Sequence, residues 1–515
     1  MNAVAAGERV PHRAMITLSI MLATIMQAID GTIANVALPH MQGSLSASGD
    51  QITWVLTSFI VATAIATPMT GWLCDRFSQK TVFLTSIAGF TLASVLCGLS
   101  TSLAQIVLSR MLQGVFGAAL VPLSQAVLLD INPREKHGSA MAIWGVGVMV
   151  GPILGPTLGG WLTDAYNWRW VFFINVPVGI MAFYGIGRYI KHVPAARRMN
   201  FDMFGFVTLS LAIGALQMLL DRGEQNDWFS SSETWIEAIL LGVSFSYFVV
   251  HTVLTPARKS FVDYHLLQNG NYITGLLFIF IVGMVLFATR ALMPTMLQNL
   301  MGYSAQAAGL VTAPGGLGTM ISMLIVGRLV GRVDLRVLLA IGFGITAFSL
   351  WSMTSYTLTL AQRDIAWPNV VQGLGLGLVF VPLSAATFGT LAPEMRAQGT
   401  AMYSLIRNIG SSIGISLVQT LLVRNTQTMH ASLTEHINIG NTALLDPALA
   451  ASYNLGSGAG AASLNGEITR QAAMVAYLDD FWMMLMLTLL VIPLLLLIRP
   501  AKKDEAPAID HAAME

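Results

Sequence analysis

The sequence predicts an all-helical protein that crosses a membrane many times. Hydrophobic residues occupy 55% of the 515 positions and charged residues only 10%, whereas an ordinary soluble domain is about 25% charged. Apolar runs long enough to cross a hydrocarbon core of about 30 Å recur from one end of the chain to the other. Because backbone polar groups inside a bilayer must be hydrogen-bonded within the protein, these runs are expected to be helices.

Fourteen apolar runs have spanning length. They cover residues 15–38, 52–72, 82–99, 103–129, 139–162, 170–188, 205–220, 236–254, 271–292, 306–326, 337–356, 367–391, 399–422 and 480–498. Most of the 27 lysines and arginines fall in segments on the same side as the N-terminus, and excess positive charge marks cytoplasmic loops. We therefore expect fourteen transmembrane helices and both termini in the cytoplasm. The first run is too long for a signal peptide and lacks a small-residue cleavage site, so we expect it to be retained.

The helices are expected to form two bundles of six with two extra helices between them. A basic linker at residues 188–200 ends the first six runs, and a helix pair at 205–254 follows it. The predicted units are residues 1–200, 201–260 and 261–500, followed by a cytoplasmic tail at 501–515.

One connection, residues 423–478, is far longer than the others and is expected to lie in the periplasm. It is rich in Gly, Ala, Ser, Asn and Thr, and a stretch of this length between elements is usually functional or mobile. Two interpretations remain open: a solvated loop with a few short helical turns, or a docking surface for a partner.

The first run contains a single ionisable side chain, Asp30. A charge in this position costs about 2.5–3.5 kcal/mol or more unless it faces protein or water. Gln27, Gly31, Ala34 and Asn35 share its helical face, which is narrow, small and polar. Asp30 is therefore either a structural carboxylate that fixes helix packing or a proton or substrate site.

A second charge, Arg110, lies inside the run at 103–129. Gln113 and Gly114 share its helical face. With the usual helical rise, Arg110 and Asp30 are at similar depths in the outer half of the membrane. We expect the two charges to be able to interact. Asp30 is the only acid well inside any of the runs, which makes it the candidate proton carrier.

Weak internal duplication supports two related halves. A glycine-led sequence at residues 71–76 follows the second run, and a similar one at 327–332 follows the second run of the last six. The sequence at 110–114 likewise resembles that at 370–373. Parallel six-helix repeats are one architecture of secondary transporters, whose substrate sites lie between the halves.

No catalytic constellation is visible among the runs. The chain has no Ser/His/Asp or Cys/His set there, no zinc-ligand spacing and no nucleotide-binding loop. Cys74 and Cys97 are interpreted as packing residues. We therefore expect no enzymatic activity, cofactor, metal or nucleic-acid partner. The absence of these residue sets argues against the competing class of protein, a receptor or membrane-embedded enzyme built on a transporter-like scaffold.

Two motifs carry a family resemblance. The loop after the second run begins at Gly71, where glycine permits a tight turn, and carries Asp75, Arg76 and Lys80, which can latch helix ends in one state. The fifth run combines small residues at four-residue spacing with prolines, which allows close packing and bending, and we expect it to be a pliant contact between the halves. Its motif residues are Gly151, Pro152, Gly155, Pro156, Gly159 and Gly160.

With these motifs the chain resembles the major facilitator superfamily over nearly its whole length. Within that superfamily it is similar to the fourteen-helix drug:proton antiporters of the EmrB/QacA type. Ser78 departs from the pattern, because the family usually has a second glycine there. The resemblance implies the major facilitator fold. Residues 110–114 match the family's fourth-helix motif, whose arginine is assigned to proton coupling, so the resemblance implies that role for Arg110.

The resemblance also implies a function and partners. It predicts a multidrug efflux transporter of a bacterial inner membrane that exchanges protons for hydrophobic or amphipathic compounds. A periplasmic membrane-fusion adaptor (EmrA-like) and an outer-membrane channel (TolC-like) would complete a tripartite pump. The alternative is a dedicated exporter of one endogenous metabolite, of the fatty acid or siderophore type.

Two further arginines need an explanation. Arg407, in the inner half of the run at 399–422, is expected to be a structural or gating charge that faces the bundle. Arg290 stands where the family commonly has a small or apolar residue. We favour extension of its side chain to the outer surface over a place in the substrate cavity. The remaining cavity candidates are Gln27, Asn35 and Gln113.

Overall fold

The computed structural model describes residues 11–191, 201–255, 263–435 and 457–498, together with residues 437 and 453. Most of the basic linker at 188–200 and the whole tail at 501–515 lie outside these residues. In the described residues, 13 helices are long and apolar enough to span a membrane, and one bent pair brings the number to 14. The predicted all-helical fold is confirmed. The side of the membrane on which the termini lie stays a prediction, and so does the division into units.

The first half of the chain supplies six spans. They are α1 (Arg13–Ser44), α3 (Trp54–Ala66) with α4 (Met69–Phe77), α5 (Gln79–Leu99), α6 (Leu103–Gly117) with α7 (Leu120–Asp130), α8 (His137–Ala165), and α9 (Trp170–Phe173) with α10 (Asn175–Tyr189). The short helix α2 (Gly49–Ile52) follows α1. Helices α3 and α4 are bent by 56° at their junction, where Pro68 has no backbone N–H to donate.

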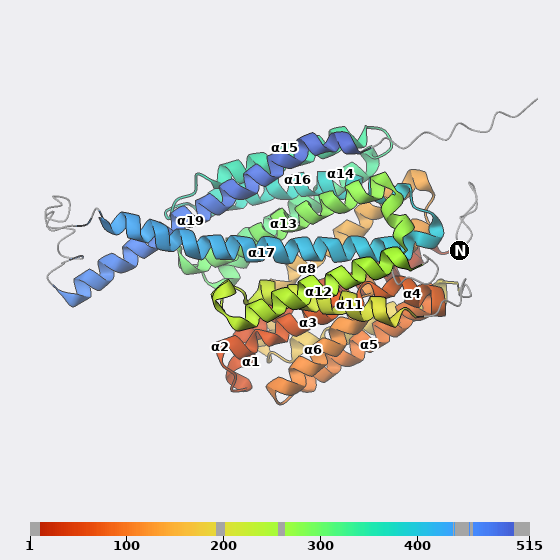
Figure 1. Cartoon of the computed structure of the whole chain (residues 1–515), viewed down its shortest axis with the longest axis horizontal. Helices are drawn as coiled ribbons and strands as arrows, with labels where there is room; N and C mark the ends of the chain where they lie inside the picture. Colours follow the sequence, from red (N-terminus) through yellow and green to blue (C-terminus); the bar gives the residue numbers. More distant parts are fainter. Residues whose placement is uncertain are drawn as a thin grey trace, which may run out of the picture.

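The rest of the chain supplies eight spans. The extra pair is α11 (Met203–Arg222) and α12 (Ser232–Leu254). The second half comprises α13 (Gly270–Asn299), α14 (Ala305–Leu329), α15 (Leu335–Met353), α16 (Gln362–Gly389), α17 (Arg396–Glu435) and α19 (Gly458–Leu494). Figure 1 shows the two halves side by side, with α11 and α12 along the boundary between them. Helix α11 packs against α3 of the first half and α17 of the second.

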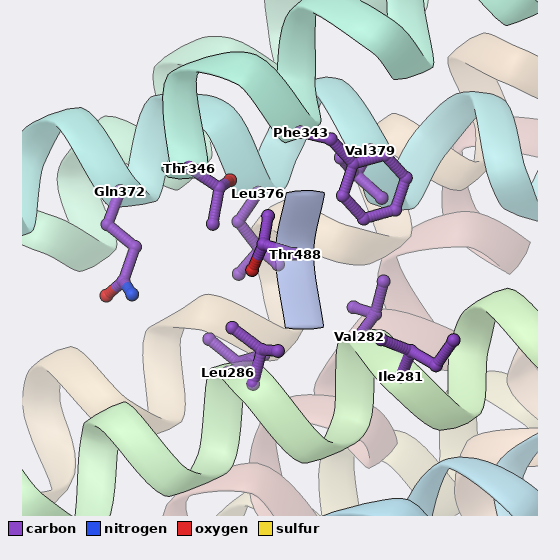
Figure 2. Close-up of a pocket in the computed structure, with 10 residues that line it drawn as sticks. Ile281, Val282, Leu286, Phe343, Thr346, Gln372, Leu376, Val379 and Thr488 are labelled. Carbon is purple, nitrogen blue, oxygen red and sulfur yellow. The ribbon is translucent and has the colours of Figure 1, made fainter. Parts of the chain in front are cut away.

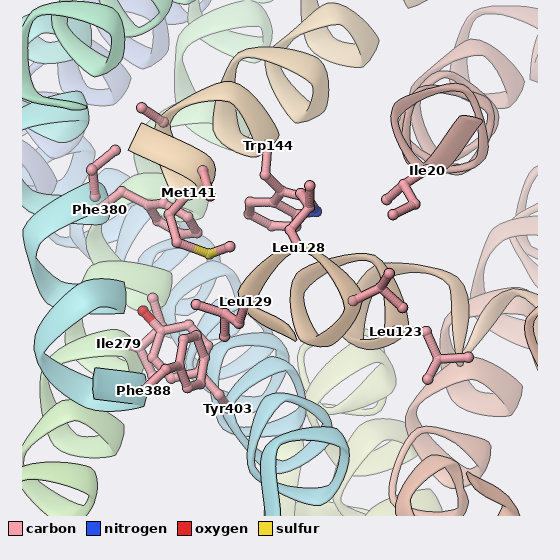
Figure 3. Close-up of a cluster of buried hydrophobic side chains, with 14 of the residues drawn as sticks. Ile20, Leu123, Leu128, Leu129, Met141, Trp144, Ile279, Phe380, Phe388 and Tyr403 are labelled. Carbon is pink, nitrogen blue, oxygen red and sulfur yellow. The ribbon is translucent and has the colours of Figure 1, made fainter. Parts of the chain in front are cut away.

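A continuous apolar core joins the two halves. Trp144 of α8 stacks on Phe380 of α16, with ring centroids 5.7 Å apart and planes inclined by 14°. Met141, Leu129 and Phe388 pack in the same cluster (Figure 3). Because these residues come from both halves, the contact between the halves is a packed interface rather than a loose one.

The segment at 423–478 differs from the expected loop. Helix α17 continues to Glu435, and α19 begins at Gly458, so an irregular loop is the wrong description for residues 423–435 and 458–478. Both helices extend beyond the rest of the bundle (Figure 1). At 1.5 Å per residue, the 40-residue α17 is about 60 Å long, which is twice the thickness of a hydrocarbon core.

Ser78 explains why the family favours glycine at its position. Its φ is 85°, in the region where L-residues are uncommon. The residue ends α4 and begins α5, and its hydroxyl accepts a hydrogen bond from the backbone N–H of Thr81. A serine therefore keeps the sharp turn between the two helices and adds a helix cap.

Candidate functional site

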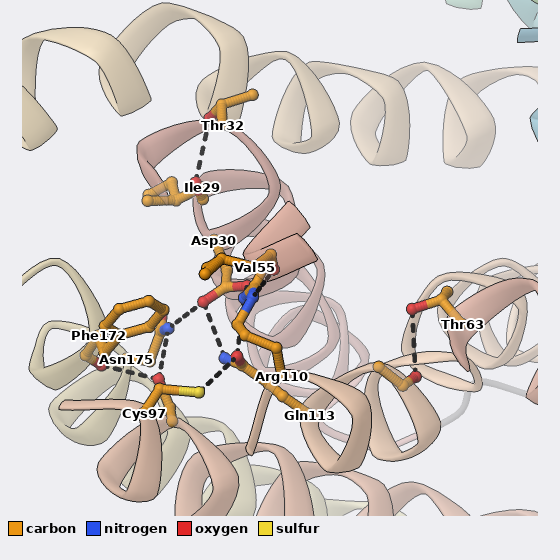
Figure 4. Close-up of polar contacts among 12 residues, drawn as sticks. Ile29, Asp30, Thr32, Val55, Thr63, Cys97, Arg110, Gln113, Phe172 and Asn175 are labelled. Carbon is orange, nitrogen blue, oxygen red and sulfur yellow. Dashed lines mark hydrogen bonds and ion pairs between the residues drawn. The ribbon is translucent and has the colours of Figure 1, made fainter. Parts of the chain in front are cut away.

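Asp30 and Arg110 form a buried ion pair. Asp30 of α1 is 0% exposed and Arg110 of α6 is 1% exposed, and Arg110 Nη1 lies 2.7 Å from Asp30 Oδ2. The contact joins two helices of the first half, as the similar depths predicted from the sequence allow (Figure 4). Because an isolated buried charge is costly, each residue depends on the other.

Neutral donors and acceptors complete the site. Asp30 Oδ1 accepts hydrogen bonds from Gln113 Nε2 and Asn175 Nδ2, both at 2.8 Å. Arg110 donates from Nη1 to Gln113 Oε1 at 2.7 Å and from Nε to the carbonyl oxygen of Val55 at 3.1 Å. The carboxylate thus receives hydrogen bonds from three side chains, and four helices (α1, α3, α6 and α10) meet at this cluster.

An aromatic ring covers the guanidinium. The Cζ of Arg110 lies 4.2 Å from the ring centroid of Phe59, a geometry that favours a cation. The ring of Phe172 lies on another side, at 5.7 Å. These rings separate the ion pair from bulk water and strengthen its electrostatic interaction.

The other polar residues of the α1 face are not part of this cluster. Gln27 lies near Gly117 of α6, and its Oε1 is buried without a hydrogen-bond partner among the described residues. Gly31 and Asn35 are exposed, and a Cβ added at Gly31 would meet no atom within 4 Å. Gly31 and Asn35 therefore face open space, whereas Asp30 faces the interior of the first half.

The glycines of the α8 motif press α8 against α1. A Cβ on Gly151 would lie 2.3 Å from the carbonyl oxygen of Ala28, and one on Gly155 would lie 2.0 Å from Thr32 Oγ1. Thr32 Oγ1 in turn donates a hydrogen bond to the Gly151 carbonyl oxygen at 3.0 Å. Gly159 and Gly160 also face α1. The motif glycines therefore pack α8 against a helix of its own half.

Other faces of α8 contact the second half of the chain. Ile153 packs against Gly316 of α14, and Pro156 lies near Gly309 of the same helix. Pro152 and Pro156 both lie inside α8, where a proline removes one backbone hydrogen bond. One helix thus carries the tight contact within its half and the contact with the other half.

Residues of the loop motif lie at the end of the bundle where α4 meets α17. A Cβ on Gly71 would lie 2.8 Å from Gln398 Cβ of α17, so only glycine allows this approach. Lys80 Nζ donates to the carbonyl oxygen of Gly187 at 2.6 Å, which ties α5 to the end of α10. Asp75 is partly buried, and Arg76 is exposed.

A second ion pair, which the sequence did not indicate, joins the halves at this end. Arg396 Nη1, at the start of α17, lies 2.8 Å from Asp130 Oδ1, at the end of α7. Both side chains are largely buried, at 8% and 11% exposed. Arg396 also donates to the carbonyl oxygen of Leu129. The available signal was an acid at the end of one run and a base at the start of another.

Arg290 and Arg407 lie inside the bundle without an acidic partner among the described residues. Arg290 Nη2 lies 3.4 Å from Met149 Sδ of α8. Met149 is buried in the middle of its helix, so extension of Arg290 toward the outer surface is the wrong interpretation. Arg407 Nη2 lies 3.4 Å from Asn408 Oδ1, and its Nε is buried without a hydrogen-bond partner in the described part of the chain.

Asp480 is a second deeply buried acid, and sequence analysis missed it. It lies well inside α19, is 0% exposed, and neither carboxyl oxygen has a hydrogen-bond partner in the described part of the chain. Asp480 stands at the edge of the predicted run at 480–498, whereas Asp30 lies well inside its own run, so Asp480 is a second buried acid but not a second acid in the middle of a predicted run. The last apolar run was placed at residues 480–498 because polar residues occur before it. The helix that contains this run begins much earlier, at Gly458.

The second half contains a small apolar cavity instead of an ion pair (Figure 2). Its volume is about 20 Å³, enough for about one water molecule. Gln372, the repeat counterpart of Gln113, lines it and donates to Thr289 Oγ1 at 3.2 Å rather than to a carboxylate. The remaining lining residues are Ile281, Val282, Val285, Leu286, Phe343, Thr346, Leu376, Val379 and Thr488.

Known proteins resemble this chain in sequence and in fold. The family model described as Major Facilitator Superfamily matches residues 20–415. The fatty acid resistance protein FarB of Neisseria gonorrhoeae is 35% identical over 95% of this chain and 96% of its own length. The multidrug export protein EmrB of Escherichia coli K12 is 36% identical over 91% of this chain and 92% of its own length.

A solved structure supports the fold alone. The human organic anion transporter MFSD10 has a TM-score of 0.59 at 13% identity, over 93% of this chain and 100% of its own. The family match and the curated relatives make the chain a multi-pass membrane efflux transporter and not an enzyme. The chain belongs to the major facilitator superfamily, among its EmrB-like members.

Proposed function

We propose that this transporter exports hydrophobic or amphipathic compounds across a bacterial inner membrane in exchange for protons. The observation that carries the proposal is the ion pair of Asp30 and Arg110, which is almost completely buried in the first half. Such intramembrane charges mark ion or substrate pathways by default. A purely structural role would be served as well by a neutral hydrogen-bonded pair, without the cost of burying two charges.

Proton binding at Asp30 would remove the electrostatic attraction between Asp30 and Arg110. A protonated carboxyl no longer neutralises Arg110, so the guanidinium becomes a buried charge held only by Gln113, the Val55 carbonyl and aromatic rings. The arrangement of α1, α6 and α10 around the pair is then less stable. A rearrangement that opens Asp30 to the other side would release the proton and restore the pair.

The gating elements we assign lie outside this cluster. We assign the contact of Gly71 with α17, together with Asp75, Arg76 and Lys80, to the closed end of the bundle. The proline-containing α8 is the element that bends or shifts during exchange, since it contacts both α1 and α14. We also assign a gating role to Arg407 of α17.

Substitution of Asp30 by asparagine tests proton coupling. Asp30→Asn keeps the shape of the side chain but cannot ionise, and we expect it to abolish substrate-driven proton release in proteoliposomes. Asp364→Asn, at an acid that is 47% exposed, is the matched control and should retain exchange. Arg110→Lys keeps a charge but loses the planar fork, so a partial defect with a shifted pH optimum is expected. Full antiport by Asp30→Asn would contradict the mechanism.

A dedicated exporter of one metabolite is the second candidate. The observation in its favour is the 35% identity to a protein named for fatty acid resistance, close to the 36% identity to a multidrug exporter. Growth of an efflux-deficient host with and without the gene, with its adaptor present, separates the candidates. Resistance to many unrelated apolar compounds supports the multidrug pump, and resistance to none supports the dedicated exporter.

We also propose a tripartite pump with a periplasmic adaptor and an outer-membrane channel. The support is the helical hairpin formed by the ends of α17 and α19, which extends beyond the rest of the bundle (Figure 1). A transporter that needed only its own bundle would connect its last two spans by a short turn. The hairpin offers the adaptor a surface outside the membrane.

A further inference from the structure

Arg290 is a cation inside the bundle whose surroundings contain no anion among the described residues. Its polar contact among the described residues joins Nη2 to the thioether sulfur of Met149 at 3.4 Å, and a thioether is a weak acceptor. A guanidinium has five N–H donors. In this arrangement Arg290 therefore retains most of its hydrogen-bonding capacity and all of its charge.

The contact places Arg290 at the interface of the two halves. The residue belongs to α13 of the second half, and Met149 belongs to α8 of the first. Transporters built from two repeats hold their substrates at this interface near the middle of the membrane. Arg290 is thus located where a transported molecule would pass.

No other charge in the described part of the chain neutralises Arg290. Arg110 is paired with Asp30, and Arg396 with Asp130. Asp480 is another buried acid, but neither of its oxygens has a hydrogen-bond partner among the described residues, so it does not pair with Arg290. Arg407 is a second arginine of the second half with only an amide contact in the described part of the chain. Arg290 is therefore left without a neutralising acid in this arrangement.

The residues around Arg290 are apolar. Leu286 precedes it by one helical turn and Met293 follows at nearly one turn, so both lie near its face of α13. Met149 forms the opposite wall, and methionine adapts its shape to varied ligands. A cation among apolar side chains suits a molecule with an anionic head and an apolar tail.

We propose that Arg290 binds the carboxylate head of a single-chain amphipathic substrate between the two halves. The guanidinium would donate two parallel hydrogen bonds to the carboxylate, and the carboxylate would displace the Met149 sulfur. The chain would then select anionic over neutral and cationic amphiphiles with the same tail. This inference rests on the proposed export of amphipathic compounds and names their class.

Binding to the purified transporter tests this selection. The protein is placed in nanodiscs of zwitterionic lipid and titrated with dodecanoate, dodecanol and dodecylammonium. We expect the tightest binding for dodecanoate, and a loss of roughly ten- to hundred-fold for dodecanoate alone in Arg290→Gln. Arg290→Lys should lie between the two, because lysine keeps the charge without the planar fork. Arg363→Gln, at an arginine that is 89% exposed, is the matched control.

The outcomes are distinct from those of the proton experiment. Binding needs no proton gradient, so failure of Asp30→Asn to alter proton flux leaves the subsite intact. Unchanged dodecanol binding by Arg290→Gln shows that this variant is folded. Equal dodecanoate affinities of Arg290→Gln and the parent protein would overturn the proposal. It would also be overturned if Arg290-dependent binding appeared only for phosphatidylglycerol added to the nanodiscs, which would indicate a lipid site.

Discussion

Two interior arginines of this protein have opposite surroundings. Arg110 has a carboxylate, an amide, a backbone carbonyl and an aromatic ring around it, whereas Arg290 has a sulfur atom. The same side chain is therefore neutralised by an acid in one half and has no acidic partner among the described residues in the other. The number of charges in each helix does not reveal how the surroundings of the two arginines differ, because these surroundings depend on which helices pack together.

Gly151 offers a prediction about packing. In Gly151→Ala the new Cβ would meet the backbone of Ala28 at 2.3–2.4 Å, and backbone atoms cannot rotate away. We expect α8 to move away from α1 and the free energy of unfolding to fall by roughly 1–3 kcal/mol. Thermal unfolding in detergent measures the change.

A second glycine provides the control. A Cβ at Gly344 of α15 would have no atom within 4 Å, so Gly344→Ala should be neutral or slightly stabilising. If both variants unfold at the temperature of the parent protein, the close contact of α8 with α1 does not limit stability.

Part of the buried cluster follows from sequence alone. Asp30, Arg110 and Gln113 are visible because a charge in an apolar run is conspicuous and because residues three or four apart share a helical face. The carbonyl of Val55 and the amide of Asn175 were not identified, since their contribution depends on how α3 and α10 pack around α1. Asp480 was missed for a different reason: it lies at the polar edge of an apolar run.

At the scale of helices, hydropathy located the membrane spans but not the full length of the last two. It detects apolar character, and α17 continues beyond residue 422 with threonine, asparagine, glutamine and arginine. Contacts between the two helices hold the extension together. Asn425 Nδ2 lies 3.4 Å from Asp479 Oδ2, and His430 Nε2 lies 2.9 Å from Asn465 Oδ1.

Shortening this hairpin tests its role as an adaptor surface. His430 and Asn465 are at the same level, so replacing residues 431–464 by a short Gly/Ser linker removes the tip without shifting the helices. We expect normal membrane insertion and weaker co-purification of the adaptor. The same linker in place of residues 224–230, between α11 and α12, is the control. If the adaptor co-purified equally well after removal of the tip, the hairpin would not be the adaptor surface.

At the scale of the whole molecule, the two halves share a helical pattern and differ in chemistry. The first half holds the ion pair of Asp30, and the second holds the small apolar cavity beside Gln372. The number of helices was predictable because each span must be apolar over its length. The contacts between halves were not, since they join residues as distant in sequence as Asp130 and Arg396.

Removal of the ion pair between Asp130 and Arg396 should weaken the contact between the halves at one end of the bundle. In Arg396→Ala, Asp130 loses its ion-pair partner, which favours separation of the halves at this end. Cys74 of α4 is a native reporter there, because it is only 9% exposed and α4 packs against α17. We expect its alkylation rate to rise severalfold in a Cys97→Ala background.

Two further variants make the measurement specific. Arg332→Ala, at an exposed arginine, should leave the alkylation rate unchanged. Exchange of the two charges, in Asp130→Arg with Arg396→Asp, should restore slow alkylation in part. Equal rates for Arg396→Ala and the parent protein would mean that the ion pair does not hold the halves together.

The orientation of the molecule gives the last prediction. Helix α19 has 37 residues and a length of about 55 Å, which is long enough for its two ends to lie on opposite sides of a hydrocarbon core of about 30 Å. The positive-inside rule assigns the C-terminal end to the cytoplasm. A reporter after Lys503 should therefore be cytoplasmic, and one inserted at Ser457, which caps the start of α19, should be periplasmic. If both reporters gave the same side, α19 would not cross the membrane, and the hairpin could not meet a periplasmic adaptor. If both were reversed, the hairpin would lie in the cytoplasm and the proposed adaptor contact would fail for that reason.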